Sequence, residues 1–151
     1  MTTIIAILLF LIFLFLSGIH FYWGFGGKWA YGAVIPTTSD NVKVMHPSVF
    51  STFVVALGLL AFGLIALMNG ITLSIEFPSW SKVIFDYGLW VIAGIFTLRA
   101  IGDFNYVGFF KKSRQTNFAQ NDTKYYSPLC LIIVILVMLL AGHHTKMLFK
   151  F

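Results

Sequence analysis

The sequence has 151 residues, of which 59% are hydrophobic and only 10% are charged, and its mean hydropathy is +0.90. Because soluble domains are typically about 25% charged, this composition excludes an ordinary water-soluble globular protein and indicates an integral membrane protein. The single cysteine, Cys130, excludes an internal disulfide framework. In a membrane protein, the net charge of +5 is typical of basic loops held at an anionic membrane surface.

Four apolar runs are long enough to cross a membrane as helices, which takes about 20 residues each. They cover roughly residues 4–25, 47–68, 82–102 and 127–146. Pro47 suits the first turn of the second run, and Asn69-Gly70 suits its end. Ser127 followed by Pro128 is typical of a helix cap and a first-turn proline. We therefore predict an all-α fold, a four-helix membrane bundle that forms one domain over residues 1–151.

Basic residues are distributed unequally over the loops that alternate between the two sides of the membrane. The first and third loops share one side and carry six Lys or Arg, whereas the other side carries three. The residues counted are Lys28, Lys43, Lys111, Lys112, Arg114 and Lys124, against Lys82, Lys146 and Lys150. Since basic loops stay in the cytoplasm, we expect both termini outside. No basic residue precedes the first run and its possible cleavage site is poor, so we expect an uncleaved helix.

Two opposite charges close the third run. Arg99 and Asp103 are four residues apart and would share one helix face, where they could pair with each other, bind a ligand, or do both. The alternation of spans brings further polar residues to the same membrane face, namely His20, Trp23, His46, Asp122 and Tyr126. Charged groups are costly in lipid. We therefore expect His20, Arg99, Asp103 and Tyr126 to point inward and share one aromatic-walled pocket at the cytoplasmic-side helix ends.

His20 has several interpretations, because it lies about one turn inside the membrane, where an unpartnered polar group is costly. It could hydrogen-bond a neighbouring helix, contact a ligand, or bind metal or haem. His20 and His46 alone make a weak metal site, so we predict no metal and leave the cofactor open. Tyr22 and Trp23 are typical of an aromatic belt.

The third loop mixes aromatic and basic side chains in the stretch FNYVGFFKKSRQTNFAQNDTKYY. This mixture predicts a segment that lies in the headgroup region, with its rings at the acyl boundary and its cations near lipid phosphates. Four cations are too few to favour nucleic acid as the partner. We therefore expect membrane lipid, and no nucleic acid, as the partner of this loop.

Three stretches, IHFYWGFGGKW, RAIGDFNYVGFFKK and TNFAQNDTKYYSPLCL, resemble the motifs of an uncharacterised bacterial family of small membrane proteins, domain of unknown function 3995. The resemblance covers nearly the whole chain and implies four spans in a bacterial inner membrane, but no activity. It departs at Asn105, where the family more often has a basic residue, which puts in doubt any role for a charge at that position. The motif positions are His20, Tyr22, Trp23, Arg99, Gly102, Asp103, Tyr106, Gly108, Asp122, Tyr126, Ser127 and Pro128.

Three functions fit these features. The first is a small binding protein or membrane enzyme whose pocket takes a lipid, a quinone or another apolar molecule, with His20 or Asp103 as proton carrier in an isomerase-like variant. The second is an accessory or assembly protein that docks a membrane partner or a second copy through the same face. A transporter or channel subunit is least favoured, because the span interiors contain almost no polar residues. The candidate ligand-binding residues are His20, Tyr22, Trp23, Arg99, Asp103, Tyr106, Asp122 and Tyr126.

Overall fold

The computed structural model describes residues 1–38, 42–71 and 79–148. Its long helices are α1 (Thr2–Gly24), α3 (Val49–Gly70), α4 (Ser79–Ile101) and α6 (Ser127–Leu148). The short elements are α2 (Tyr31–Val34), α5 (Asn117–Asn121) and the π-helical turn η1 (Asp122–Tyr126). Each long helix is long and apolar enough to cross a membrane. This confirms the predicted all-α membrane bundle and a multi-pass membrane protein.

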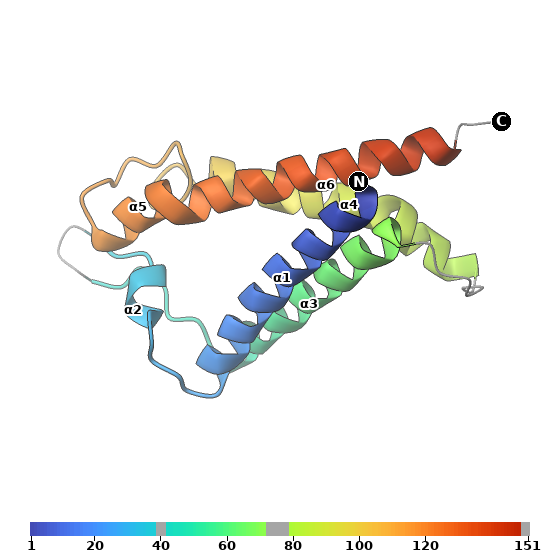
Figure 1. Ribbon diagram of the computed structural model, residues 1–151. Coiled ribbons are helices and arrows are strands. Elements are labelled where there is room, and N and C mark those ends of the chain that lie inside the picture. Colours follow the sequence, from blue (N-terminus) through green and yellow to red (C-terminus); the bar gives the residue numbers. More distant parts are fainter. Residues whose placement is uncertain (39–41, 72–78, 149–151) are drawn as a thin grey trace.

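The long helices associate as two antiparallel pairs, α1 with α3 and α4 with α6. Figure 1 shows the pairs meeting near the N-terminus and diverging toward the end that carries α2 and α5. Small residues bring α1 and α3 together, since a Cβ on Gly70 would clash with Ala6 and one on Gly63 would lie 3.1 Å from the Cβ of Phe13. The Ser17 hydroxyl donates to the Ala56 carbonyl across this pair at 2.7 Å.

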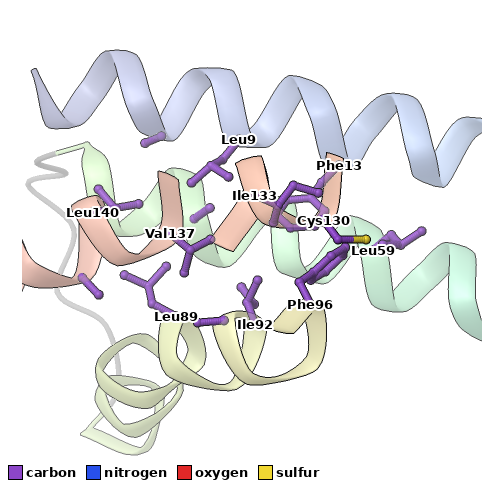
Figure 2. Packing of buried hydrophobic residues seen from close by; sticks show 14 of the residues in the cluster. Leu9, Phe13, Leu59, Leu89, Ile92, Phe96, Cys130, Ile133, Val137 and Leu140 are labelled. Carbon is purple, nitrogen blue, oxygen red and sulfur yellow. The ribbon is translucent and has the colours of Figure 1, made fainter. Parts of the chain in front are cut away.

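The hydrophobic core lies where the two pairs meet, and all four long helices contribute to it (Figure 2). Three aromatic rings pack together in it, because the Phe13 ring lies edge-on against Phe62 at 6.0 Å and against Phe96 at 5.5 Å. Cys130 is buried in this cluster. The principal buried side chains are Leu9, Phe13, Leu59, Leu89, Ile92, Phe96, Cys130, Ile133, Val137 and Leu140.

The start of the last span differs from the sequence-based expectation, because Ser127 does not cap a helix. Ser127 has helical backbone angles and continues one helical path from Asn117 through η1 into α6. The cap is Thr116, whose hydroxyl accepts from the Ala119 N–H at 3.1 Å. The π-turn comes directly before Pro128, which lacks the N–H that an α-helix would direct to the Lys124 carbonyl. The Ser127 N–H bonds to the Asp122 carbonyl, five residues back.

Candidate functional site

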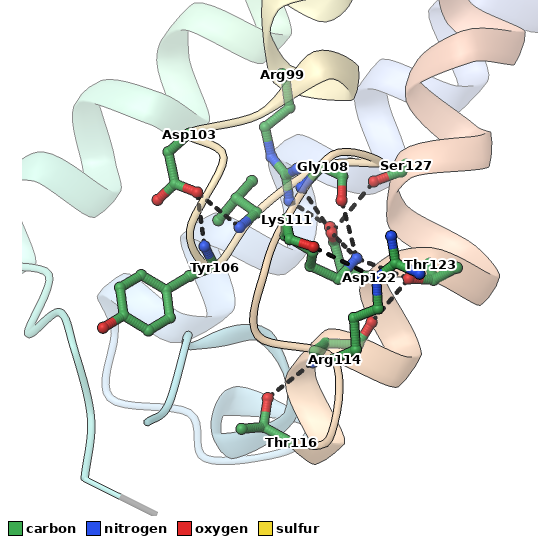
Figure 3. A network of polar contacts seen from close by, with 12 residues as sticks. Arg99, Asp103, Tyr106, Gly108, Lys111, Arg114, Thr116, Asp122, Thr123 and Ser127 are labelled. Carbon is green, nitrogen blue, oxygen red and sulfur yellow. Dashed lines mark hydrogen bonds and ion pairs between the residues drawn. The ribbon is translucent and has the colours of Figure 1, made fainter. Parts of the chain in front are cut away.

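Asp122 is the centre of a polar cluster at the end of the molecule that carries α5 (Figure 3). The residue is fully buried, and four groups donate to its carboxylate. Oδ1 accepts from Arg99 Nη2 at 3.0 Å. Oδ2 accepts from the Gly108 N–H at 2.8 Å, from Lys111 Nζ at 2.9 Å and from the Ser127 hydroxyl at 3.2 Å. One carboxylate therefore joins the end of α4, the third loop and the start of α6.

Lys111 is a buried partner of Asp122, with only 2% of its surface exposed. Its ammonium group also donates to the Gly108 carbonyl at 2.9 Å and to the Thr123 hydroxyl at 2.7 Å. These three acceptors match the three N–H groups of an ammonium ion. The sequence placed Lys111 among the loop cations and gave it no role in a site. Lys111 is eleven positions from Asp122, but residues 111–116 form no helix or strand, so no periodic pattern could have signalled the contact.

Two glycines let the third loop fold back on the end of α4. Gly102 and Gly108 have φ angles of +87° and +88°, a region that side-chain-bearing residues rarely adopt. A Cβ on Gly102 would clash with the Val107 carbonyl, and one on Gly108 would clash with the Ile101 carbonyl. This close approach presents the Gly108 N–H to Asp122.

Asp103 does not pair with Arg99, so of the alternatives left open by their spacing the mutual salt bridge is wrong. The Asp103 carboxylate Oδ1 accepts from the backbone N–H groups of Asn105, Tyr106 and Val107 at 3.0, 2.7 and 2.9 Å. The physical reason is that α4 ends at Ile101, before the helical register that would align the two side chains reaches position 103. Partial burial raises the pKa of Asp103, but the three N–H groups outweigh it and hold that pKa below its ordinary value.

The candidate residues His20, Tyr22 and Trp23 lie at the end of α1 and contact their own segment. His20 Nδ1 lies 2.8 Å from the Leu16 carbonyl oxygen, and its ring packs edge-on against Trp23 at 5.1 Å. Trp23 Nε1 donates to the Trp29 carbonyl at 2.9 Å, while the Tyr22 hydroxyl accepts from the Trp29 N–H at 3.4 Å. These contacts fold the chain back as it leaves α1.

Tyr126 joins the first loop to the last span. Its hydroxyl donates to the Ala33 carbonyl of α2 at 3.3 Å, and its ring packs against Phe118 at 6.1 Å. The contacts of His20, Asp103 and Tyr126 thus lie in three local groups, and Arg99 belongs to the Asp122 cluster. The single pocket expected for all four residues stays a prediction.

Arg99 is the member of the cluster with unused binding capacity. Its Nη2 contacts Asp122, whereas its Nη1 is buried without a hydrogen-bond acceptor in the described parts of the chain. Arg99 and Lys111 contribute two cations against the single anion of Asp122. The arrangement therefore favours one further oxygen ligand, preferably a negatively charged one. Within residues 1–38, 42–71 and 79–148, no three His, Cys, Asp or Glu side chains group as metal ligands do.

Comparison with known proteins relates the chain to one family. The family model described as "Protein of unknown function (DUF3995)" matches residues 13–137, which include every contact of the Asp122 cluster. No curated protein and no solved structure matches the chain.

Proposed function

The chain belongs to the DUF3995 family, and we propose that it binds an amphiphilic small molecule, such as a lipid or a quinone, through Arg99. The observation that carries this proposal is the buried Arg99 Nη1, which has no acceptor among the residues that the structure describes, while Nη2 is fixed on Asp122. A buried N–H without a partner costs about 1–3 kcal/mol, and more on a charged group. A ligand oxygen that accepted from Nη1 would remove this cost.

The guanidinium group suits an anionic or carbonyl oxygen. It is planar and always charged, and Asp122 holds one of its nitrogens in place, so little freedom is lost when a ligand binds the other. The extra positive charge of the cluster favours an oxygen that carries negative charge. Arg99 lies in the last turn of α4, near the end of a span, where headgroup oxygens meet acyl chains.

The hydrogen-bond contacts of the two candidate proton carriers, Asp103 and His20, favour binding over catalysis. Asp103 is engaged by three backbone N–H groups, and His20 is held against its own helix by its Leu16 contact. In the described parts of the chain, both residues contact their own segments and not Arg99. From the excess of basic residues in the first and third loops, we further propose that this site faces the cytoplasm in a bacterial inner membrane.

The test compares what co-purifies with the wild-type protein and with Arg99→Lys. The lysine keeps the positive charge and can still reach Asp122, but it removes the second guanidinium nitrogen. We expect organic extraction and mass spectrometry to recover a stoichiometric amphiphile from the wild type and to find it depleted in Arg99→Lys. Lys112→Gln removes an exposed charge from the same loop and serves as the control that retains the molecule.

Two outcomes would contradict the proposal. If folded Arg99→Lys, verified by its melting temperature, retains the same molecule at the same stoichiometry, Arg99 is not its ligand. If a membrane protein rather than an amphiphile co-purifies with the wild type and is lost from the variant, the accessory or docking function is favoured instead.

A further inference from the structure

A second polar feature lies beside the Asp122 cluster and is not used by it. A cleft of about 400 Å³ is lined by Phe109, Arg114, Ala119, Gln120, Thr123 and Lys124. This volume is in the range of small-molecule sites, roughly 300–1,000 Å³. Arg99 is not among the residues that line this cleft. The cleft is therefore distinct from the free nitrogen of Arg99, although Thr123 belongs to its wall and also accepts from Lys111.

The charge of the cleft is uncompensated. Arg114 and Lys124 are both exposed, and neither forms a salt bridge with a carboxylate in the described segments. The Arg114 Nε donates a long bond of 3.4 Å to the Lys111 carbonyl. Gln120 adds an amide group, and no wall residue is acidic. The nearby Asp122 is already neutralised by two cations. Such a lining favours an anion with several oxygens, because guanidinium binds phosphate through parallel hydrogen bonds.

The surroundings of the cleft indicate where the anion comes from. The cleft lies on α5 and η1, at the beginning of the span that runs from Asn117 to His143. Phe109 lines it, and the neighbouring residue Phe110 is 64% exposed. The Lys124 ammonium lies 5.1 Å from the ring centroid of Tyr125, a cation–π contact that places charge and aromatic surface together. Cations beside exposed rings at a span end match the boundary between lipid phosphates and acyl chains.

We propose that this cleft binds the phosphate headgroup of an anionic phospholipid, with Arg114 and Lys124 as ligands of the phosphate oxygens and Phe109 against the glycerol and upper acyl region. The site does not require Arg99. It differs from the amphiphile site in its residues, and its variants replace no side chain that contacts Asp122.

The test is native mass spectrometry of the whole protein in detergent, titrated with phosphatidylglycerol and, separately, with phosphatidylcholine. Arg114→Gln and Lys124→Gln remove the two cleft cations, and Lys112→Gln removes a neighbouring exposed cation outside the cleft. We expect each cleft variant to weaken phosphatidylglycerol binding about fivefold, the effect of one basic residue at an anionic lipid surface. Lys112→Gln should weaken it less than twofold, and phosphatidylcholine binding should change little in any variant.

Two results would overturn the inference. Equal losses in all three variants would mean that general surface charge, not the cleft, attracts the lipid. Displacement of phosphatidylglycerol by inorganic phosphate at millimolar concentration would assign the cleft to a free phosphate instead of a lipid. A failure of this inference can be told apart from a failure of the proposed function. The cleft variants should keep any amphiphile that depends on Arg99, and Arg99→Lys should bind phosphatidylglycerol as the wild type does.

Discussion

Replacing Asp122 by asparagine tests the Asp122 cluster most directly, because it changes charge with almost no change of shape. The carboxylate accepts four hydrogen bonds, one at Oδ1 and three at Oδ2. An amide has only one oxygen, so its NH₂ group must face either the Arg99 donor or the three donors at the other position. The less costly orientation keeps the oxygen toward Gly108, Lys111 and Ser127 and turns the NH₂ toward Arg99. Even so, two cations lose their anion.

The expected loss follows from the burial of the ion pair. Lys111 and Asp122 have side chains that are 1% and 0% exposed, and removing one partner of a buried pair costs about 3–5 kcal/mol. The Arg99 side chain is 35% exposed, so solvent screening reduces its share. We expect Asp122→Asn to lower the free energy of unfolding by about 3–5 kcal/mol, measured by denaturant titration in mixed micelles.

A double-mutant cycle separates the ion pair from general damage. Lys111→Met removes the second charge but keeps an unbranched side chain in the buried position. The double variant Asp122→Asn with Lys111→Met should lose less stability than the sum of the singles, with a coupling of roughly 1–3 kcal/mol. A loss below about 1 kcal/mol for Asp122→Asn, or additive losses in the cycle, would refute the assignment of this cluster as the structural link between α4 and α6.

Three further predictions concern the third loop. Gly108→Ala should destabilise the protein by more than about 1 kcal/mol because its φ is +88° and a Cβ would meet the Ile101 carbonyl, whereas Gly94→Ala, which has open space, should be neutral in the same thermal melts. Because folding lowers the pKa of Asp103, its ionised carboxylate contributes stability above the unfolded pKa of about 3.8, and this contribution is lost as the pH falls through the lower folded value. An Asp103→Asn variant should lack this acid-dependent loss of stability. Equal acid-unfolding profiles of the variant and the wild type would contradict the prediction. Gln115→Cys, in a Cys130→Ser background, should resist an impermeant thiol reagent in intact cells and react after lysis; labelling of intact cells would invert the topology.

The spans could be predicted from sequence because they depend on a local property. An apolar run of sufficient length has few alternatives to a membrane helix, and all four runs became helices. The charge pair could not be predicted in the same way. The spacing of Arg99 and Asp103 implied a shared helix face only if the helix continued through Gly102, and the positive φ of that glycine ends the register first.

The polar cluster was only partly predictable for a related reason. Arg99 and Asp122 were both candidates, since each is a charge near a span end. Their pairing and the burial of Lys111 depend on how the loop folds back, which is tertiary information. At Ser127 a local signal was present but misleading, because a serine before a proline commonly marks the start of a helix. In the structure the Ser127 hydroxyl donates to Asp122 instead. The π-turn lets the helical path continue through the proline.

The short chain distance between Lys111 and Asp122 has a consequence for biogenesis. The two residues are eleven positions apart, so closing the loop between them costs little entropy compared with a long-range contact. Both emerge from the ribosome before α6 is synthesised. An acidic residue entering a bilayer unpaired is costly, up to about 2.5–3.5 kcal/mol at a helix centre on the translocon scale. Lys111 can neutralise Asp122 while the last span is still being made, which lowers this barrier, whereas Arg99 is 23 positions from Asp122 and must close a longer loop to reach it.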